Sequence, residues 1–321
     1  MEKPLISIVV LNWNGKRFID PFMKSLLMQT YPADRLELVF TDNGSTDDSV
    51  AYFQSRFNDD DRYKVVLNGR NYGYSGGNNL GMMNASGQYV LLCNNDLELE
   101  PRAVEELVSA AEHHNADATT VKLMYRNRPG VINNAGSRLD PDSDWPIYDV
   151  GINEEDIGQF DQDQEISAFC GACVLLRRDF LQSVGLFDHH FFLYFEDGDL
   201  SWRGRKAGKH YWLAPNAVAY HVHTGSSQEG SPIFNHFVIR NRWLIVVKNA
   251  RTKVIMKALR STLKDQLVLR VKRLVMALFG KYPKRLALKE FVLSQRMLWA
   301  ALFMTPYALC KRFHLIRERH L

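Results

Sequence analysis

The feature that most constrains the fold is an alternation of short apolar runs with longer amphipathic segments. The runs Leu5–Leu11 and Leu36–Thr41 are rich in β-branched residues, as is typical of strands covered on both faces of a parallel sheet. Lys64–Leu67 and Tyr89–Cys93 continue the pattern, and a segment with helical period follows each run. Four strand–helix units in succession predict an α/β fold with a doubly wound, mostly parallel sheet flanked by helices.

Two further apolar runs extend this pattern. We expect Ala118–Tyr125 to be a fifth strand and Ile166–Arg177 a sixth. Between them, residues 126–164 are polar, acidic and weakly periodic, and a loop of that length is usually a lid, a binding segment or an insertion. Near the second strand, Ser45 or Thr46 is expected to cap the helix that follows.

The composition is that of a globular protein and excludes several other classes. The chain has 321 residues, of which 46% are hydrophobic and 24% are charged. Four cysteines are too few for a disulfide scaffold, and the single C-x-x-C pair, Cys170 and Cys173, lacks a second pair for zinc. We interpret both as small buried residues, with a redox role as the weaker alternative. This cysteine usage favours a reducing compartment, and we expect no secretory signal before the first strand.

Charge divides the chain into an acidic and a basic part. Residues 235–321 hold 20 Lys and Arg against 3 Asp and Glu, a net charge of +17, so residues 1–234 carry −13. We therefore expect one domain over residues 1–234 and a basic helical extension over 235–321. Nucleic acid is excluded as a partner, because the larger part is acidic and no recognition motif is found.

The basic extension is too polar to cross a membrane. Its longest uncharged apolar stretch, Met297–Cys310, has 14 residues and contains Pro306, whereas a spanning helix needs about 20. Lys and Arg beside large apolar residues favour amphipathic helices that lie on an anionic membrane surface. The alternatives are a helical bundle that packs on the larger domain with a solvated basic face, and a contact between copies in a homo-oligomer.

Acidic side chains follow several apolar runs, where strands of an open α/β sheet would end. Three such sites are present: Asp42, Asp96, and the group Glu196, Asp197 and Asp199. Ligands of open α/β sheets bind beyond the carboxyl ends of the strands, so we expect these acids to meet at one rim. Buried carboxylates without partners are costly, and a divalent cation held together with substrate phosphates accounts for them. The alternative at Asp96 is a turn that only starts the next helix.

The segment Asn68–Gly81 is rich in glycine and asparagine. Glycine lets the backbone approach a ligand closely, and the helix start predicted here can face a phosphate. The pattern is neither a P-loop nor a clean G-x-G-x-x-G after the first strand. A P-loop or dinucleotide-binding fold is therefore not favoured.

Six motifs in register resemble those of the family 2 glycosyltransferases of the GT-A fold, and most closely those of the bacterial rhamnosyltransferase-like branch. They cover residues 5–225 in the family's order. The motifs are Ile8–Gly15, Asp42–Asp47, Gly76–Gly81, Asn94–Asp96, Gly171–Arg178 and Phe195–Leu200.

The resemblance implies a donor site along the first strands. Asp42 resembles the acid that binds the nucleotide base, and Leu11, Asn12 and Asn14 would lie beside that base. The segment from Arg70 to Asn79 would border the ribose and diphosphate. Within that segment the implied contacts are Arg70, Gly76, Gly77 and Asn78.

The resemblance also implies a Mg²⁺ or Mn²⁺ site. Asn94, Asn95 and Asp96 stand where the family has its D-x-D motif, and Asp96 matches the metal-binding acid. Asn94 departs from that motif, so the ribose contact would use an amide and the site has one negative charge fewer. His221 matches a histidine that completes the metal shell, with His223 as the competing choice.

The implied catalytic base is Asp197, whose partly apolar setting is expected to raise its pKa. Glu196, Asp199 and Trp13 would contact the acceptor or support the site. Two alternatives remain open. Glu196 and Asp199 would be structural if they pair with Arg203 or Arg205, and Trp13 would have no acceptor role if it packs in the core.

Asp47 and the aromatic run Phe191–Phe195 have structural interpretations as well. We interpret Asp47 as an acid at a helix start rather than a ligand. We interpret Phe191–Phe195 as core and acceptor wall.

The function expected from this resemblance is inverting transfer of a sugar, rhamnose from dTDP-rhamnose, to a hydroxyl of a lipid-linked glycan in cell-surface polysaccharide synthesis. The enzyme would be cytoplasmic and peripheral on the inner face of the cell membrane. The alternatives are a hexosyl- or N-acetylhexosaminyltransferase that uses a UDP-sugar, a sugar-phosphate nucleotidyltransferase, and an inactive membrane-bound scaffold.

Overall fold

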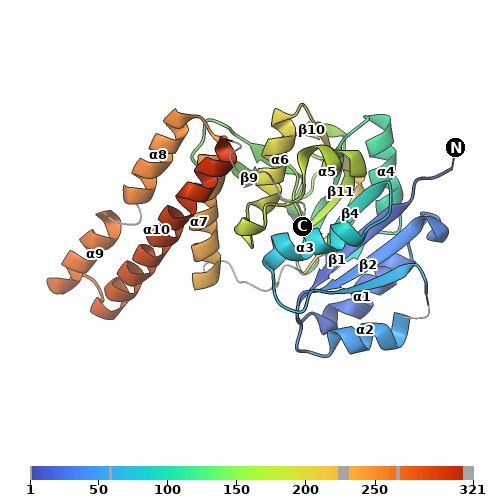
Figure 1. The fold of residues 1–321 in the computed structure, drawn as a ribbon, viewed down its shortest axis with the longest axis horizontal. Coiled ribbons are helices and arrows are strands. Elements are labelled where there is room, and N and C mark those ends of the chain that lie inside the picture. The colour runs from blue at the N-terminus through green and yellow to red at the C-terminus, as the bar shows by residue number, and fades with distance from the viewer. Residues whose placement is uncertain (1, 58–59, 223–230, 265–267, 314–321) are drawn as a thin grey trace. The chain divides into compact units, whose positions relative to one another are not determined.

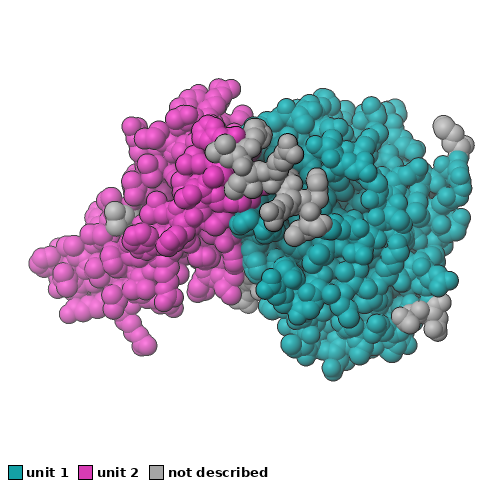
Figure 2. All heavy atoms as spheres, in the orientation of Figure 1, with its two compact units in different colours: residues 1–139, 147–226, 320–321 teal, residues 140–146, 227–319 magenta. Residues whose placement is uncertain are grey.

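The protein consists of two compact units, coloured teal and magenta in Figure 2. The computed structural model describes residues 2–57, 60–222, 231–264 and 268–313. Unit 1 comprises residues 1–139, 147–226 and 320–321, and unit 2 comprises residues 140–146 and 227–319.

Unit 1 is built on one mixed sheet, whose main path has the order β10-β12-β6-β11-β4-β1-β2-β3 (Figure 1). Of these eight strands, all but β10 and β11 run in the same direction. Two short strands, β5 and β7, pair with β12 and β6. The main strands are β1 Ile6–Asn12, β2 Leu36–Asp42, β3 Tyr63–Leu67, β4 Tyr89–Asn94, β6 Ala118–Tyr125, β10 Gln164–Ile166, β11 Cys173–Arg177 and β12 Tyr211–His221, and the short ones are β5 Leu97–Leu99 and β7 Ile132–Asn134.

Helices cover both faces of this sheet because its central strands are apolar on both sides. In β1, Ile8 and Val10 join the core cluster that contains α1, α2 and α4, whereas Val9 joins the cluster that contains α3, α5 and α6. The doubly wound α/β arrangement is therefore confirmed. The helices are α1 Lys16–Leu27, α2 Ser49–Phe57, α3 Gly73–Asn84, α4 Ala103–His113, α5 Arg178–Val184 and α6 Glu196–Lys206, with 3-10 turns η1 Ala33–Arg35 and η2 His189–Phe191.

The single strand expected over Ile166–Arg177 was wrong, because residues 167–172 leave the sheet between β10 and β11. There Ala168 exchanges two backbone hydrogen bonds with Ser137, of 2.9 and 3.0 Å. Ser137 belongs to a separate two-stranded sheet, formed by β8 Ser137–Leu139 and β9 Ile147–Asp149. The polar segment 126–164 thus contains short strands of its own.

Unit 2 is a set of helices, with the segment 140–146 packed among them. Asp144 accepts a hydrogen bond of 2.6 Å from the Ser261 hydroxyl and lies 3.3 Å from the Lys257 ammonium. The helices are α7 Pro232–Asn249, α8 Thr252–Leu263, α9 Leu269–Leu278 and α10 Lys284–Arg312. The helical period expected for the extension is thus present.

α10 is the longest described helix and packs against α7 and α9. The Trp243 indole of α7 donates a 2.8 Å hydrogen bond to the Thr305 hydroxyl of α10. Among the described residues, no helix is both long enough and apolar enough to cross a membrane.

Candidate active site

The strand ends of unit 1 meet through a buried asparagine. Parallel pairing sets Asn12 beside Asp42, and the Asn12 amide donates to the Asp42 carboxylate at 3.0 Å and to the Ser49 hydroxyl at 2.8 Å. The Asn95 side-chain amide in turn donates to the side-chain oxygen Oδ1 of Asn12 at 3.1 Å. Asn12, which is fully buried, therefore connects the ends of β1 and β2 with the turn after β4.

Asp42 is buried, and both its oxygens accept hydrogen bonds from its own neighbourhood. In addition to Asn12, the Gly44 and Ser45 amides donate to it at 3.1 and 2.9 Å. The carboxylate therefore shapes the turn after β2. Its contact with a nucleotide base stays a prediction.

The cap expected at Ser45 or Thr46 was wrong, because α2 begins later, at Ser49. The Ser45 hydroxyl accepts from the Asn14 amide at 2.9 Å, and the Thr46 amide donates to the Asn14 side chain at 2.7 Å. The helix starts are held by Asp47, as expected for a helix-start acid. Its carboxylate accepts from the Ser49 amide at 3.3 Å and from the backbone amide of Lys16, the first residue of α1, at 3.0 Å.

The pKa of Asp47 reflects these contacts. Burial opposes ionisation, but the hydrogen bonds from Ser49 and from the Lys16 amide outweigh it and lower the pKa below its usual value. Asp47 is therefore a fully ionised structural acid at neutral pH.

Two of the glycines of α3, Gly77 and Gly81, face the sheet. A Cβ added to Gly77 would lie 2.6 Å from a methyl of Leu11, and one added to Gly81 would lie 2.5 Å from a methyl of Val9. Gly76 would likewise meet Tyr72, and the Asn78 amide donates to the Tyr74 carbonyl at 2.9 Å. These residues bring the helix close to the strand ends, and a direct donor contact of Gly76, Gly77 or Asn78 stays a prediction.

The loop before α3 is organised by Asn43, a residue that the sequence analysis missed. Its side chain donates to Asn71 at 3.0 Å and accepts from Asn68 and from the Tyr72 amide, both at 3.1 Å. Arg70 is exposed, and its guanidinium lies 4.5 Å from the Tyr72 ring centroid. The cation predicted to border the diphosphate is therefore available on the surface of this loop.

Asp96 and His221 meet beyond the sheet. β5 follows Asp96 directly and pairs with β12, with Leu97 opposite His221. The carboxylate Oδ1 of Asp96 lies 3.3 Å from Nε2 of His221, and both side chains are buried. The opposite ring nitrogen, Nδ1, lies 2.9 Å from Oδ1 of Asn133 in β7. His223, the competing choice, lies outside the described residues.

This arrangement fits a divalent cation. With Nδ1–H donating to Asn133, the lone pair of Nε2 faces a carboxylate oxygen, and a proton or a cation between them relieves that repulsion. Adjacent ligands of an octahedral ion at about 2.1 Å lie about 3 Å apart, close to the observed separation. Asn94, half-buried at the end of β4, lacks a hydrogen bond through its side chain within the described residues and remains available to a ligand.

A second group with metal-ligating atoms lies at η2. Ligand atoms of Asp188, His189 and His190 all fall within 4.8 Å of one another. Part of this group is already engaged, because Asp188 Oδ1 accepts from the His190 amide at 3.1 Å and lies 3.2 Å from its ring.

Asp197, at the start of α6, is held by two backbone amides. Its carboxylate accepts from the Gly171 amide at 2.8 Å and from the Gly198 amide at 2.7 Å. Burial nevertheless raises its pKa to about 6, with a further contribution from the charge of Asp149. The next residue along this backbone, Ala172, accepts from the Asn94 amide at 2.9 Å. The segment 171–172 thus joins the predicted base to the end of β4.

Glu196 differs from its neighbour in having a carboxylate oxygen without a hydrogen-bond partner among the described residues. Glu196 is buried, and this oxygen is Oε2. Burial and the adjacent Asp197 raise the pKa of Glu196 well above its usual value. The pairing with Arg203 or Arg205 that we considered is therefore not observed for Glu196. Asp199 does pair with Arg203, at 2.9 Å, whereas Arg205 pairs with Glu165.

The backbone before α6 is strained. Phe192, Tyr194 and Phe195 have φ of 64°, 70° and 70°, a region that costs L-residues roughly 1–3 kcal/mol each. α3 packs directly on this turn, where a Cβ at Gly73 would lie 2.3 Å from the Phe192 carbonyl oxygen. Such strain persists where packing imposes it, and here it lies immediately before Glu196 and Asp197, the first residues of α6. Trp13 is 43% exposed, which excludes the core position considered for it.

The segment 126–164 supplies two site residues that the sequence analysis missed. Asn133 contacts His221, and the next residue, Asn134, donates to Asp149 at 2.8 Å. Both asparagines belong to a short buried strand without a periodic pattern, so only their polar type in a buried position could have indicated them. Cys93 and Cys173 form no disulfide, and their sulfur atoms are in contact at 3.7 Å.

Comparison with known structures identifies the class. The mannosyltransferase PcManGT from Pyrobaculum calidifontis, solved with GDP-Man and Mn²⁺, aligns with a TM-score of 0.55 at 14% identity over 96% of this chain and 88% of that one. The fold is that of the GT-A glycosyltransferases. The sequence pattern of the family described as "Glycosyl transferase family 2" matches residues 7–185, more than half of the chain. The chain belongs to this family.

Two sequence relatives give the range of similarity. The "Uncharacterized protein y4gI" of Sinorhizobium fredii is 28% identical over 229 residues, 70% of this chain and 25% of that protein. The "N-acetylglucosaminyl-diphospho-decaprenol L-rhamnosyltransferase" of Mycobacterium tuberculosis is 24% identical over 243 residues, 68% of this chain and 76% of that protein. This chain spans well under half of the first curated relatives it matches, between 16% and 40% of their length.

Proposed function

We propose that this glycosyltransferase is an inverting, metal-dependent enzyme that transfers a sugar from a nucleotide diphosphate to a hydroxyl of a lipid-linked glycan. The donor we propose is dTDP-rhamnose. This choice is supported by the motif resemblance and by the name of the mycobacterial relative, which includes both L-rhamnose and a decaprenyl diphosphate. A UDP-hexose is the alternative donor, and one structural neighbour was solved with UDP and Mn²⁺.

The observation that carries the mechanism is the Asp197 carboxylate, which has a pKa of about 6 and is joined through residues 171–172 to the end of β4. A base with this pKa is ionised at neutral pH and still basic enough to accept a proton from an alcohol. The acceptor oxygen forms its bond to the anomeric carbon as its proton passes to Asp197. On the opposite face, the bond from that carbon to the diphosphate breaks, and the nucleoside diphosphate leaves.

Asp96 and His221 would hold the Mg²⁺ or Mn²⁺ ion, with Asn133 orienting the imidazole. The ion would supply charge neutralisation for the diphosphate that leaves. Asn94, in place of a D-x-D acid, would offer an amide to the ribose. Asp42, Arg70 and the backbone at Leu11 and Asn12 would border the nucleotide, and Trp13, exposed near the same strand end, would contact the acceptor.

The test is release of nucleoside diphosphate from a panel of dTDP-, UDP- and GDP-sugars, with a polyprenyl diphosphate glycan as acceptor and with Mg²⁺, Mn²⁺ or EDTA. We expect turnover with one donor class, its loss in EDTA, and product of inverted anomeric configuration. Asp197→Asn should lower turnover by about 10²- to 10⁴-fold while nucleotide binding persists. Unchanged turnover in that variant would remove Asp197 from the mechanism, and product of retained configuration would refute direct displacement.

A further inference from the structure

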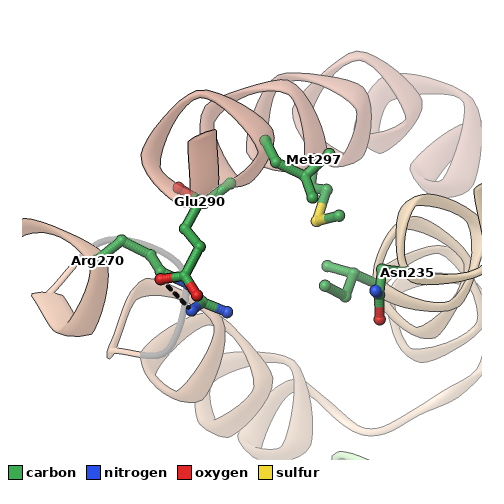
Figure 3. Close-up of a pocket in the computed structure, with 7 residues that line it drawn as sticks. Asn235, Arg270, Glu290 and Met297 are labelled. Carbon is green, nitrogen blue, oxygen red and sulfur yellow. Dashed lines mark ion pairs between the residues drawn. The ribbon is translucent and has the colours of Figure 1, made fainter. Parts of the chain in front are cut away.

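Helix α10 has two apolar faces. The face that packs in unit 2 is lined by small residues spaced seven apart, or two helical turns, and all are buried. They are Ala287, Ser294, Ala301 and Ala308. Met297 is buried on the same side, next to a small pocket that Asn235 of α7 also lines (Figure 3).

The opposite side of α10 is also apolar, although it is exposed. Trp299 and Phe303 are 60% and 78% exposed, and four other large apolar side chains accompany them. At 100° per residue the six lie within an arc of about 120°, on the side away from the buried positions. We call this surface the α10 ridge, and it consists of Leu288, Val292, Trp299, Leu302, Phe303 and Leu309.

The ridge is accompanied by positive charge. Arg285, Lys289 and Arg296 fall along one edge of the arc by the same helical periodicity. The single acid of α10, Glu290, is turned inward, where it lies 3.2 Å from Arg270 of α9 (Figure 3). It also lies 2.9 Å from Arg273 of the same helix. The outward side of α10 therefore combines large apolar groups with cations and carries no acid among the residues of this helix.

We propose that the α10 ridge inserts into the headgroup region of an anionic lipid bilayer, with the flanking cations in contact with lipid phosphates. Large contiguous apolar surfaces are rare on soluble monomers. A bilayer matches both components, because apolar side chains enter the acyl boundary while Lys and Arg extend to the anionic surface. A second copy of the chain is less suitable, since pairing two ridges would bring like-charged edges together.

This proposal rests on the lipid-linked acceptor of the proposed function, which would be reached at a membrane surface. Helix α9 extends the α10 ridge. α9 packs against α10 and carries its own exposed stripe at helical spacing. That stripe consists of Val271, Val275 and Leu278, with Phe279 directly after it. Both helices belong to unit 2, so the membrane contact would be made by the helical unit.

The test is flotation of the full-length protein with vesicles of phosphatidylcholine alone or with 30% phosphatidylglycerol. We expect binding to the anionic vesicles, weakened in 0.5 M salt because salt screens the cationic edge. The double variant Trp299→Ser, Phe303→Ser should reduce the bound fraction at least tenfold. Leu286→Ser is the matched control, because Leu286 is 45% exposed on α10 but lies outside the arc, and it should float like the wild type.

Several outcomes would overturn the proposal. Flotation of the double variant at the wild-type level would do so, as would equal loss in Leu286→Ser. If the double variant instead abolishes a dimer seen without lipid, the ridge is a contact between copies. Far-UV circular dichroism shows whether the double variant folds, and Trp299→Phe supplies a second readout through loss of quenching by brominated lipid. Asp197→Asn should float normally, so failure of the catalytic proposal leaves this result intact.

Discussion

The acids at the first strand ends and those at the start of α6 have opposite environments. Asp42 and Asp47 accept hydrogen bonds from backbone amides and hydroxyls around them, and the pKa of Asp47 is lowered. Glu196 is buried and Asp197 is half-buried beside it, and the pKa of each is raised. Acids whose oxygens accept several hydrogen bonds stabilise turns. Acids with a raised pKa are less stable as anions, so they bind a proton or a cation more readily.

The Asp96–His221 pair is a third case: with Nδ1–H donating to Asn133, the Nε2 atom of His221 faces a carboxylate oxygen, and a cation or proton between them would relieve the repulsion. Replacing Asn133 by Leu would remove the acceptor that fixes the imidazole, and we expect Mn²⁺ affinity to fall by about 10- to 100-fold. Titration calorimetry in the presence of nucleoside diphosphate measures this. Asn133→Asp should keep or increase the affinity, and equal affinity in all three proteins would show that Asn133 does not orient His221.

The raised pKa of Asp197 predicts that kcat increases with pH in the acidic range. Since the base must be ionised, kcat should rise with pH and level off above about 6, falling about tenfold per unit below that value. A pH–rate profile of nucleoside diphosphate release checks this. The residual kcat of Asp197→Asn should not depend on pH in this range. The same pH dependence in that variant would show that another group titrates.

The satisfied acid Asp47 should matter for stability and not for chemistry. Asp47→Ala leaves the Ser49 and Lys16 amides without their partner, and we expect a loss of about 0.5–2 kcal/mol in the free energy of unfolding. Urea denaturation measures the loss. Because the folded pKa of Asp47 is lowered, its contribution is present at neutral pH and disappears as the pH falls through that pKa. A large fall in kcat of the folded variant would contradict this assignment.

Glu196 should show a pH dependence of stability opposite to that of Asp47. Its raised pKa means that the folded state binds the proton more tightly than the unfolded state, so stability falls as pH rises from about 4.5 toward the folded pKa. Glu196→Gln removes this slope, so its free energy of unfolding at pH 7 should equal or exceed that of the wild type. Thermal melts across pH 5–8 test it, and a loss of 3–5 kcal/mol would indicate a paired buried charge instead.

The main strands of unit 1 follow from the sequence alone, because runs rich in β-branched residues, such as Leu5–Leu11, are typical of strands covered on both faces in an α/β fold. The sequence also placed Asp96 and Asp197 at segment ends, where ligands of such folds bind. The basic extension was likewise evident from its charge and helical period.

The hydrogen-bond partners of each acid, and the side chains that orient it, are known only from the tertiary structure. Asn133 and Asn134 come from a segment with no period, and their partners are close only because β7 pairs with β6 at the edge of the sheet. Gly77 and Gly81 of α3 face Leu11 and Val9 of β1. The α10 ridge is apparent only once the buried side of α10 is known. The local hydrophobic pattern of a segment indicates which of its residues are buried. Contacts between residues distant in the chain depend on how the segments pack, and the sequence pattern does not show this.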